Sequence, residues 1–101
     1  MISLLDVRPK HITLGAFQKR LGVMNVFAID TSTNPICVAL RSYLNRLTFI
    51  DLDDPDLPSL LGLMVSANQP TANGAFPGSG PITADLVNQV INTPVEEKER
   101  P

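Results

Sequence analysis

Apolar side chains recur at helical spacing most regularly between residues 34 and 47. They stand at positions i, i+4, i+7, i+8 and i+11, which places them on one face of an α-helix. Asn34 can accept a hydrogen bond from a free amide of the first turn, and Pro35 suits the first helical position because no N–H is needed there. The pattern therefore predicts a central helix from Pro35 to Leu47. Its apolar stripe consists of Ile36, Leu40, Tyr43, Leu44 and Leu47.

Two shorter apolar segments come before this helix. Thr13 can cap a helix that extends to Leu21, and Gly22 after it is typical of a C-terminal stop because glycine accepts a left-handed backbone. The segment from Val23 to Thr31 is apolar with weak periodicity, which fits either a short helix or a buried strand. Its apolar residues at positions 23, 26 and 27 follow helical spacing, so we expect a second helix there.

Two more helices are predicted after the central one. Asp54 or Asp56 can cap a helix that continues to about Ser66, since apolar residues follow at helical spacing. Thr83 can cap a last helix, and Pro94 ends it because proline lacks the backbone donor that a helix interior requires. Helices of this length are marginal alone, so we expect them to be stabilised by mutual burial.

These segments predict a fold that is mainly all-α, a small bundle of four or five short helices. Residues 48–53 alternate only in part and predict a short β-like connector, while residues 2–7 form either a short N-terminal strand or an arm on the helices. At 101 residues the chain has room for one modest core, so we expect residues 1–94 to form a single helical domain. Residues 95–101 are mostly charged and predict a disordered tail.

A Pro- and Gly-rich loop is predicted at residues 66–81, which lack apolar periodicity. Structureless loops of this length are uncommon inside compact domains, so this one is either disordered or used in binding. Phe76 is the only aromatic residue of the loop. It either anchors in a partner's pocket or folds back onto its own core. The candidate partner-binding residues are Asn73, Phe76 and Pro77.

Composition and charge exclude several classes of function. A net charge of −2 gives no general attraction for nucleic-acid phosphates or anionic lipid. Cys37 is the only cysteine, so no intramolecular disulfide can form, and its place in the central helix favours a buried apolar role. The apolar run at residues 1–5 is too short for a signal peptide, and no stretch reaches membrane-spanning length. We expect a cytoplasmic protein with no membrane partner.

No residue pattern predicts a metal site, a cofactor or catalysis. The acidic cluster at residues 51–56 lacks calcium-loop spacing, because Asp56 and Gly62 stand where glycine and glutamate are required. Helix capping explains the cluster better. His11 is the sole histidine and has no second imidazole for zinc. An enzyme would require His11, Cys37 and the acidic cluster to converge in one pocket, so we expect no enzyme activity and no cofactor.

Residues 13–32 offer an alternative function. Two predicted helices joined by a glycine turn resemble a divergent helix-turn-helix, in which the second helix enters the major groove of DNA. Lys19 and Arg20 supply positive charge on the first helix. The second helix offers only Asn25 for base contacts and carries Asp30, which repels phosphate. A DNA-binding regulator is therefore the second hypothesis, although the charge makes nucleic acid an unfavoured partner.

One further set of features follows a characteristic order along the chain. Its members are Ile12-Thr13-Leu14 with Phe17 and Arg20, Ala28-Ile29-Asp30, Tyr43-Leu44 with Leu47, Ile50-Asp51-Leu52-Asp53-Asp54-Pro55, and Ile82-Thr83-Ala84-Asp85 with Ile91 and Pro94. This order resembles that of small prophage-encoded proteins found among phage tail genes. The resemblance implies a non-enzymatic accessory protein, or a minor component, in tail or virion assembly. Its partner would be a phage structural protein or a second copy, and its location the cytoplasm of a bacterial host or the virion.

Overall fold

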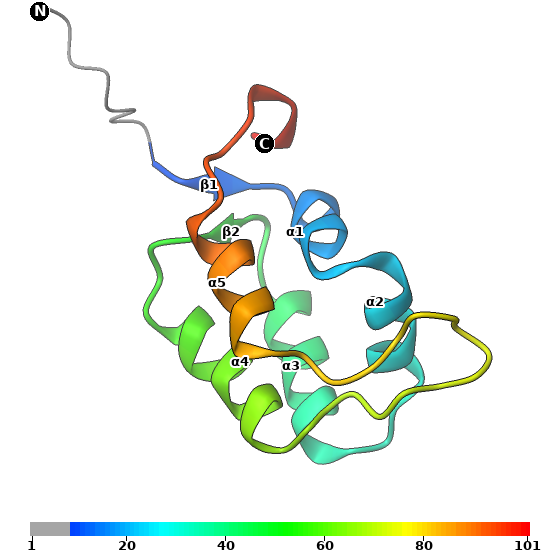
Figure 1. Cartoon of the computed structure of the whole chain (residues 1–101). Helices are drawn as coiled ribbons and strands as arrows, with labels where there is room; N and C mark the ends of the chain where they lie inside the picture. Colours follow the sequence, from blue (N-terminus) through cyan, green and yellow to red (C-terminus); the bar gives the residue numbers. More distant parts are fainter. Residues whose placement is uncertain (1–8) are drawn as a thin grey trace, which may run out of the picture.

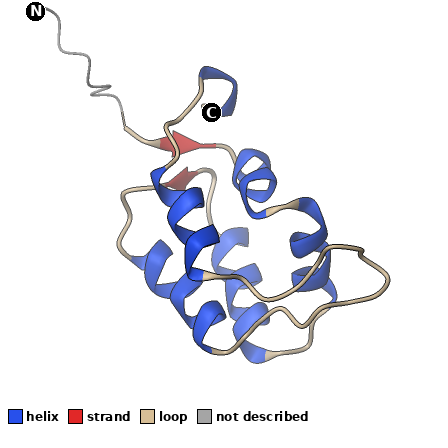
Figure 2. Ribbon diagram, in the orientation of Figure 1, coloured by secondary structure: helices blue, strands red, loops and turns tan. Residues whose placement is uncertain are grey.

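Five α-helices form the body of the part of the chain that the structure describes (Figure 1). The computed structural model describes residues 9–101, so the strand or arm predicted at residues 2–7 lies outside the described residues. The predicted fold class is confirmed, because the described chain is a mainly helical bundle with one short β-ribbon (Figure 2). The helices are α1 (Leu14–Leu21), α2 (Val23–Thr31), α3 (Pro35–Asn45), α4 (Asp56–Ser66) and α5 (Ala84–Asn92).

Helices α1, α3 and α5 begin at the capping residues that the sequence predicts. The side chains of Thr13, Asn34 and Thr83 each accept a hydrogen bond from a first-turn amide, at 3.0, 2.9 and 3.1 Å. Each bond satisfies an amide that helix geometry leaves free. Before α4, the Asp54 Oδ1 atom accepts a hydrogen bond from the Asp56 amide at 2.9 Å. Local side-chain chemistry therefore sets where these helices start.

A two-stranded antiparallel ribbon joins β1 (His11–Ile12) to β2 (Ile50–Asp51). Strand β2 falls within the connector predicted at residues 48–53. Strand β1 is not predicted, because two residues are too few for an alternating pattern. Helix α3 ends at Asn45, before the predicted Leu47, since the chain already turns towards β2 there.

The helices pack as a closed ring around one core. Each helix contacts the next along the chain, and α5 contacts α1, so the first and last helices are neighbours (Figure 1). Fully burying one large apolar side chain stabilises a fold by roughly 1.5–3 kcal/mol, and every helix of this ring contributes at least one. The buried cluster consists of Ile12, Phe17, Leu21, Ile29, Cys37, Leu40, Ile50, Leu52, Leu57, Leu61, Met64, Ile82 and Val90.

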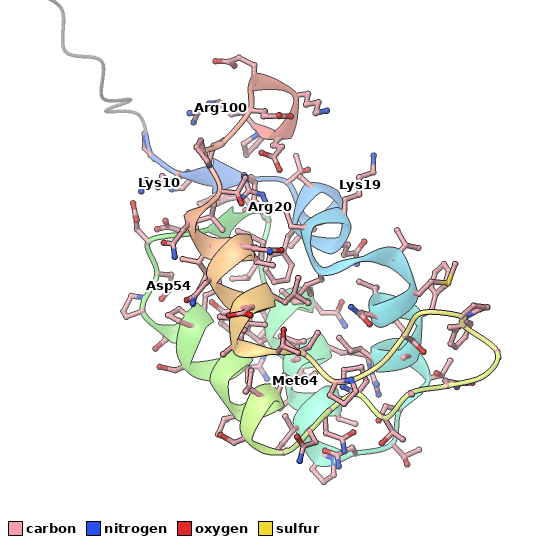
Figure 3. All side chains as sticks on the ribbon, in the orientation of Figure 1. Lys10, Lys19, Arg20, Asp54, Met64 and Arg100 are labelled. Atoms are coloured by element: carbon pink, nitrogen blue, oxygen red, sulfur yellow. The ribbon has the colours of Figure 1, made fainter. Side chains whose placement is uncertain are left out.

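The residues after α5 fold back onto the bundle. The sequence predicts a disordered tail at residues 95–101, whereas the structure forms the 3₁₀-helix η1 (Glu97–Glu99) and places Glu99 against Arg20 of α1. The charges of this segment are visible in the sequence. Their partners are not, because the ring closure that brings α1 beside α5 supplies them. Figure 3 shows Arg20 and Arg100 at this end of the molecule.

Candidate functional site

Helix α2 leaves three large apolar side chains in contact with solvent. Val23, Met24 and Phe27 are 46, 41 and 42 % exposed, although residues of these types are usually buried. They stand at i, i+1 and i+4 and share one side of the helix. The helix buries Ala28 and Ile29 against the core. It therefore presents apolar residues both inward and outward, which explains the weak periodicity of its sequence.

The loop at residues 66–81 lies alongside this exposed strip (Figure 1). The ring of Phe76 packs on the ring of Phe27, with centroids 5.4 Å apart and planes tilted by 50°. Tilted pairs are a favourable arrangement of aromatic rings. Phe76 remains only half-buried, and Pro77 beside it is exposed. Phe76 thus folds back onto its own protein and still contributes to the outer surface.

Asn73 shapes the loop from within. Its side-chain oxygen accepts a hydrogen bond from the Ala75 amide at 2.9 Å, and its carbonyl accepts one from the Phe76 amide at 2.9 Å. Its own amide donates to the Ser79 hydroxyl at 3.0 Å. Asparagine is favoured in turns for this kind of bonding. Of the three predicted site residues, Phe76 and Pro77 form surface, and Asn73 positions them.

Asn25 fastens the loop to the helices. Its Oδ1 atom accepts a hydrogen bond from the Gly80 amide at 3.1 Å, and its Nδ2 atom donates to the Leu21 carbonyl at 2.9 Å. The second bond satisfies a carbonyl at the end of α1, where helix geometry leaves carbonyls free. The sequence does not indicate the loop contact, because Gly80 lies 55 residues away.

The exposed residues of α2 and of the loop together form the α2–loop surface. We define it as Val23, Met24, Phe27, Phe76 and Pro77. The sequence offers the loop residues as candidates for binding, and the structure adds the exposed apolar residues of α2 beside them. The ring contact between Phe27 and Phe76 makes them neighbours.

The geometry of α1 and α2 gives no support to the DNA-binding alternative. Gly22 alone joins the two helices, whereas a helix-turn-helix uses a turn of roughly three to four residues. Helix α2 contains no Lys or Arg, and its exposed side is apolar. Arg20 is engaged by groups of its own chain. Among the described residues, α2, which would be the recognition helix, therefore offers no positive charge to DNA phosphates.

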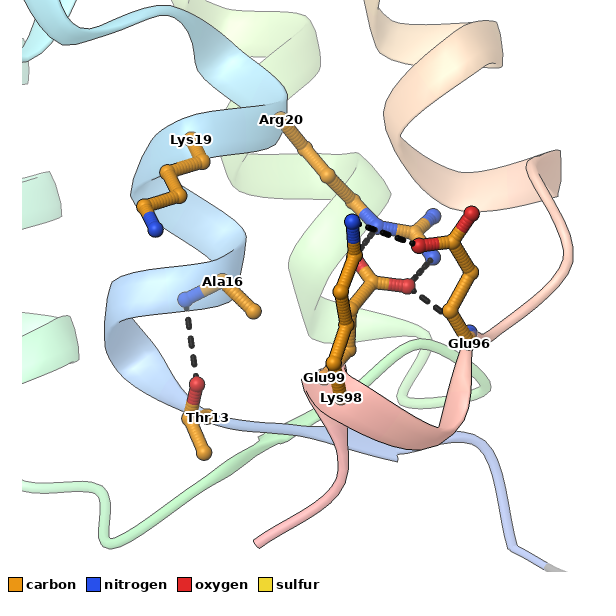
Figure 4. Close-up of a pocket in the computed structure, with 7 residues that line it drawn as sticks. All are labelled: Thr13, Ala16, Lys19, Arg20, Glu96, Lys98 and Glu99. Atoms are coloured by element: carbon orange, nitrogen blue, oxygen red, sulfur yellow. Dashed lines mark hydrogen bonds and ion pairs between the residues drawn. The ribbon is translucent and has the colours of Figure 1, made fainter.

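A second candidate site lies where α1 meets the C-terminal residues (Figure 4). Arg20 donates from Nε and Nη2 to the two carboxylate oxygens of Glu99, at 2.8 and 2.7 Å. Its Nη1 and Nη2 atoms also donate to the carbonyls of Val90, Thr93 and Pro94, at 2.8, 2.8 and 3.2 Å. These bonds use the five N–H donors of the guanidinium group. One side chain thus binds the C-terminal end of α5 and holds the following residues on α1.

The Glu99 carboxylate is stabilised in its charged form. Its hydrogen bonds with Arg20 lower the pKa of Glu99 to about 2, against the opposing effect of burial. The Glu96 amide donates to the same carboxylate at 2.9 Å, which lowers the pKa further. The Thr13 amide donates to the Glu99 carbonyl at 2.8 Å. Sequence reasoning named Arg20 only as a surface charge and missed Glu99 as its partner, because charged residues near a chain end are usually solvated.

Arg41 closes the end of another helix in a similar way. Its Nη1 atom donates to the carbonyls of Ile29 and Ser32, the second at 2.8 Å. These carbonyls stand at the C-terminal end of α2, where a cation is favourable. The sequence places Arg41 on the polar side of the central helix, and only the packing of α3 on α2 supplies its partners.

His11, Cys37 and the acidic cluster do not meet in one pocket of the described chain. His11 stacks on Phe49 with ring centroids 4.1 Å apart, and its Nε2 atom lies 3.9 Å from the Asp51 carboxylate. Cys37 is fully buried near the opposite end of α3, where its thiol faces Gln69 Oε1 at 3.9 Å. About 12 Å of helix separates Cys37 from the end of α3 that leads to the ribbon. Within residues 9–101, no group of His, Cys, Asp or Glu side chains is arranged to hold a metal.

Asp54 has a structural role in the acidic cluster. Its Oδ1 atom accepts a hydrogen bond from the Asp56 amide just before α4, and its Oδ2 atom accepts one from the Tyr43 hydroxyl at 3.1 Å. The N-cap residue of α4 is Pro55, which makes no side-chain cap bond. Burial, and then the hydrogen bond and charge of Asp54, raise the pKa of Tyr43 to about 12. Asp51 Oδ1 accepts a hydrogen bond from the Asp53 amide at 2.9 Å. The cluster therefore shapes the turns that lead into α4, whereas the side-chain cap predicted at Asp54 or Asp56 is not formed.

The search for a membrane span and the comparisons with known proteins complete the description. Across residues 9–101, no single helix has the length and apolarity to cross a membrane; α2 and α3 reach that threshold only as a pair, and the pair is bent by 110°. No family model, curated protein or solved structure matches this chain. The resemblance to prophage proteins therefore stays a hypothesis that rests on the residues quoted for it.

Proposed function

We propose that this protein is a non-enzymatic interaction module that binds another protein through the α2–loop surface. One observation carries the proposal: the contact of Phe27 with Phe76 joins two exposed apolar elements into one surface. Covering this surface removes apolar area from water, at roughly 25 cal/mol per Å². A small fold with such a surface gains stability by binding.

The residue types of the surface suit this role. Phenylalanine and methionine are enriched at the centres of protein interfaces, and the surface contains Met24, Phe27 and Phe76. The loop is also held in place by two asparagines. Asn25 of α2 accepts from the Gly80 amide, and Asn73 of the loop accepts from the Ala75 amide. A surface that is ordered before binding loses less conformational entropy when a partner covers it.

We propose a phage structural protein as the partner, with the chain acting as an accessory or minor component in tail or virion assembly. The support for this partner is the resemblance to prophage proteins encoded among tail genes. The support for a binding role is the α2–loop surface itself. A second copy of the chain is the competing occupant of that surface.

The test is a pull-down with the tagged chain from a lysate of an induced lysogen, with captured proteins identified by mass spectrometry. Two variants disrupt the surface, Met24→Lys and Phe76→Ala. Leu63→Lys is the matched control, because Leu63 is 53 % exposed on α4, which packs against α3 and α5. We expect tail or baseplate proteins to be enriched by the parent and by Leu63→Lys, and to be lost with the other two variants.

Three other results would contradict parts of the proposal. Enrichment that survives both Met24→Lys and Phe76→Ala moves the contact away from the α2–loop surface. A lysate in which no virion protein is enriched removes the tail assignment. A concentration-dependent dimer that Met24→Lys abolishes assigns the surface to a second copy. Circular dichroism on each variant verifies that the helices are retained.

A further inference from the structure

The C-terminal strap, residues 94–101, holds to the bundle largely through polar contacts. Val95 packs against the core. The side chains of the next three residues are 62, 71 and 83 % exposed, so they add little apolar burial. Beyond Val95, the strap is held by polar contacts: Glu99 binds Arg20, and Arg100 donates to the Pro9 carbonyl at 2.8 Å. Hydrogen bonds and ion pairs of this kind can be exchanged for those of another acidic segment.

Glu99 is recognised at two points. Arg20 binds its carboxylate through two parallel N–H···O bonds, a geometry that matches the two oxygens of a carboxylate or a phosphate. The Thr13 amide binds its main-chain carbonyl. Together these groups recognise both the side chain and the backbone of a single glutamate residue. The guanidinium is positioned for this task by its bonds to the carbonyls at the end of α5.

A cavity of about 420 Å³ opens beside this ion pair, between α1 and the strap (Figure 4). Ala16 and Lys19 line it from α1, and Glu96 and Lys98 line it from the strap. Lys19 is exposed and has no ionic partner among residues 9–101. The strap therefore occupies only part of the cleft, and the cavity has a positive charge on its α1 side.

We propose that the cleft between α1 and the strap binds an acidic segment of another protein, and that the strap is the chain's own occupant of this site. A glutamate of the incoming segment replaces Glu99 on Arg20 and Thr13. A neighbouring carboxylate pairs with Lys19, where the strap presents Lys98 of the same charge. The incoming segment thus gains one ion pair that the strap cannot make. This site is separate from the α2–loop surface and does not depend on its function.

Because the strap is covalently joined to the bundle, it competes strongly with any other segment for the cleft. A segment attached by a short linker acts at an effective concentration on the order of millimolar. An acidic partner therefore binds weakly while the strap is in place and more tightly once Glu99 no longer holds it. The strap is in this sense an autoinhibitory contact.

The test is an NMR titration of the isotope-labelled full-length chain, observing the Arg20 Nε–H and Thr13 amide signals. The first probe is a synthetic peptide of residues 93–101 that carries Lys98→Glu. The second is the same peptide with Glu99→Gln added. We expect the first peptide to shift both signals, at about tenfold lower concentration in the Glu99→Ala chain than in the parent. The second peptide should bind at least about tenfold more weakly, and Lys19→Ala should weaken the first severalfold.

The proposal is overturned if a folded Glu99→Ala chain shows no shift, or if both peptides bind it equally. If the Glu99→Ala chain does not fold, the proposal is tested by titrating the parent chain. Excess first peptide must then shift the parent's Glu99 amide as the strap leaves, and an unchanged signal rejects the proposal. A dimer detected by light scattering, in which strap exchange pairs Arg20 with a second copy's Glu99, assigns the cleft to self-assembly and also rejects it.

Discussion

Arg20 and Glu99 lie 79 residues apart in the chain, and their side chains meet in two hydrogen bonds of 2.7 and 2.8 Å. The pair links the second turn of α1 to the strap, and the other Arg20 donors bind carbonyls at the end of α5. The first helix, the last helix and the C-terminal residues are thus joined by one guanidinium group. Its side chain is only 8 % exposed, so these bonds are shielded from water.

Arg20→Ala should lower the free energy of unfolding by about 3 kcal/mol, because it leaves a largely covered carboxylate and several carbonyls without donors. Arg20→Lys should recover part of this loss, since an ammonium keeps the charge but cannot form the two-pronged bond. Urea unfolding measures both values. Lys19→Ala is the control and should stay within about 0.5 kcal/mol of the parent. Equal losses of unfolding free energy for Arg20→Ala and Lys19→Ala would show that the hydrogen bonds of Arg20 do not stabilise the fold.

Stability should depend on the ionisation of Glu99. The pKa of this carboxyl falls from an ordinary value of 4.5 to about 2 in the folded chain. A lowered folded-state pKa contributes stability above the ordinary value, and this contribution is lost as pH falls towards the folded-state value. The difference in unfolding free energy between the parent and Glu99→Gln should therefore shrink as pH falls from about 6 to about 2.5. A difference that is constant across this range would mean that the ionised pair contributes nothing.

The single tyrosine, Tyr43, should lose its proton at a higher pH than an ordinary tyrosine. Tyr43 has a pKa of about 12 against an ordinary 10.0, and ultraviolet absorbance of tyrosinate reports it without interference because the chain has no tryptophan. Asp54→Asn should lower this pKa only in part, since burial is the larger cause and the asparagine oxygen can still accept from the Asp56 amide. The raised pKa also adds stability below about pH 10 that is lost as pH rises towards 12. A parent tyrosine that titrates at its ordinary pH would argue that its hydroxyl is solvated.

Asn25→Ala should loosen the loop without unfolding the bundle. The substitution removes the acceptor of the Gly80 amide, 3.1 Å away, and the donor to the Leu21 carbonyl. We expect faster hydrogen exchange at Gly80, and a loss of unfolding free energy of about 1 kcal/mol. If the α2–loop surface is the binding site, partner capture should weaken as well. Unchanged exchange at Gly80 would show that other contacts hold the loop.

Duplex DNA should not bind this protein with the salt dependence of a regulator. Helix α2 presents an apolar side, and Arg20 is occupied by Glu99. Electrophoretic retardation at low salt, compared between the parent and Lys19→Ala, is the measurement. The comparison omits Arg20, because its substitution disturbs the fold. Retardation that weakens with salt and with Lys19→Ala would restore the DNA-binding hypothesis.

The helices were predictable because their signals are local. A cap and its amide lie within three residues of each other, as at Thr13 and Thr83, and apolar spacing repeats within one or two turns. The ambiguity at Val23 to Thr31 has a physical origin, since α2 has apolar residues on its outer side too. Those exposed side chains weaken the very periodicity that identifies a helix.

The sequence by itself determined the helices, the starting points of α1, α3 and α5, the Pro/Gly loop and Phe76 as the loop's prominent residue. Tertiary structure alone decided that Phe76 meets Phe27, that β1 pairs with β2, and that the charged C-terminal residues bind α1. The reason is distance along the chain. Capping and helical periodicity act between near neighbours, whereas the contacts of Asn25 and Arg20 join residues 55 and 79 positions apart, and only ring closure brings these together.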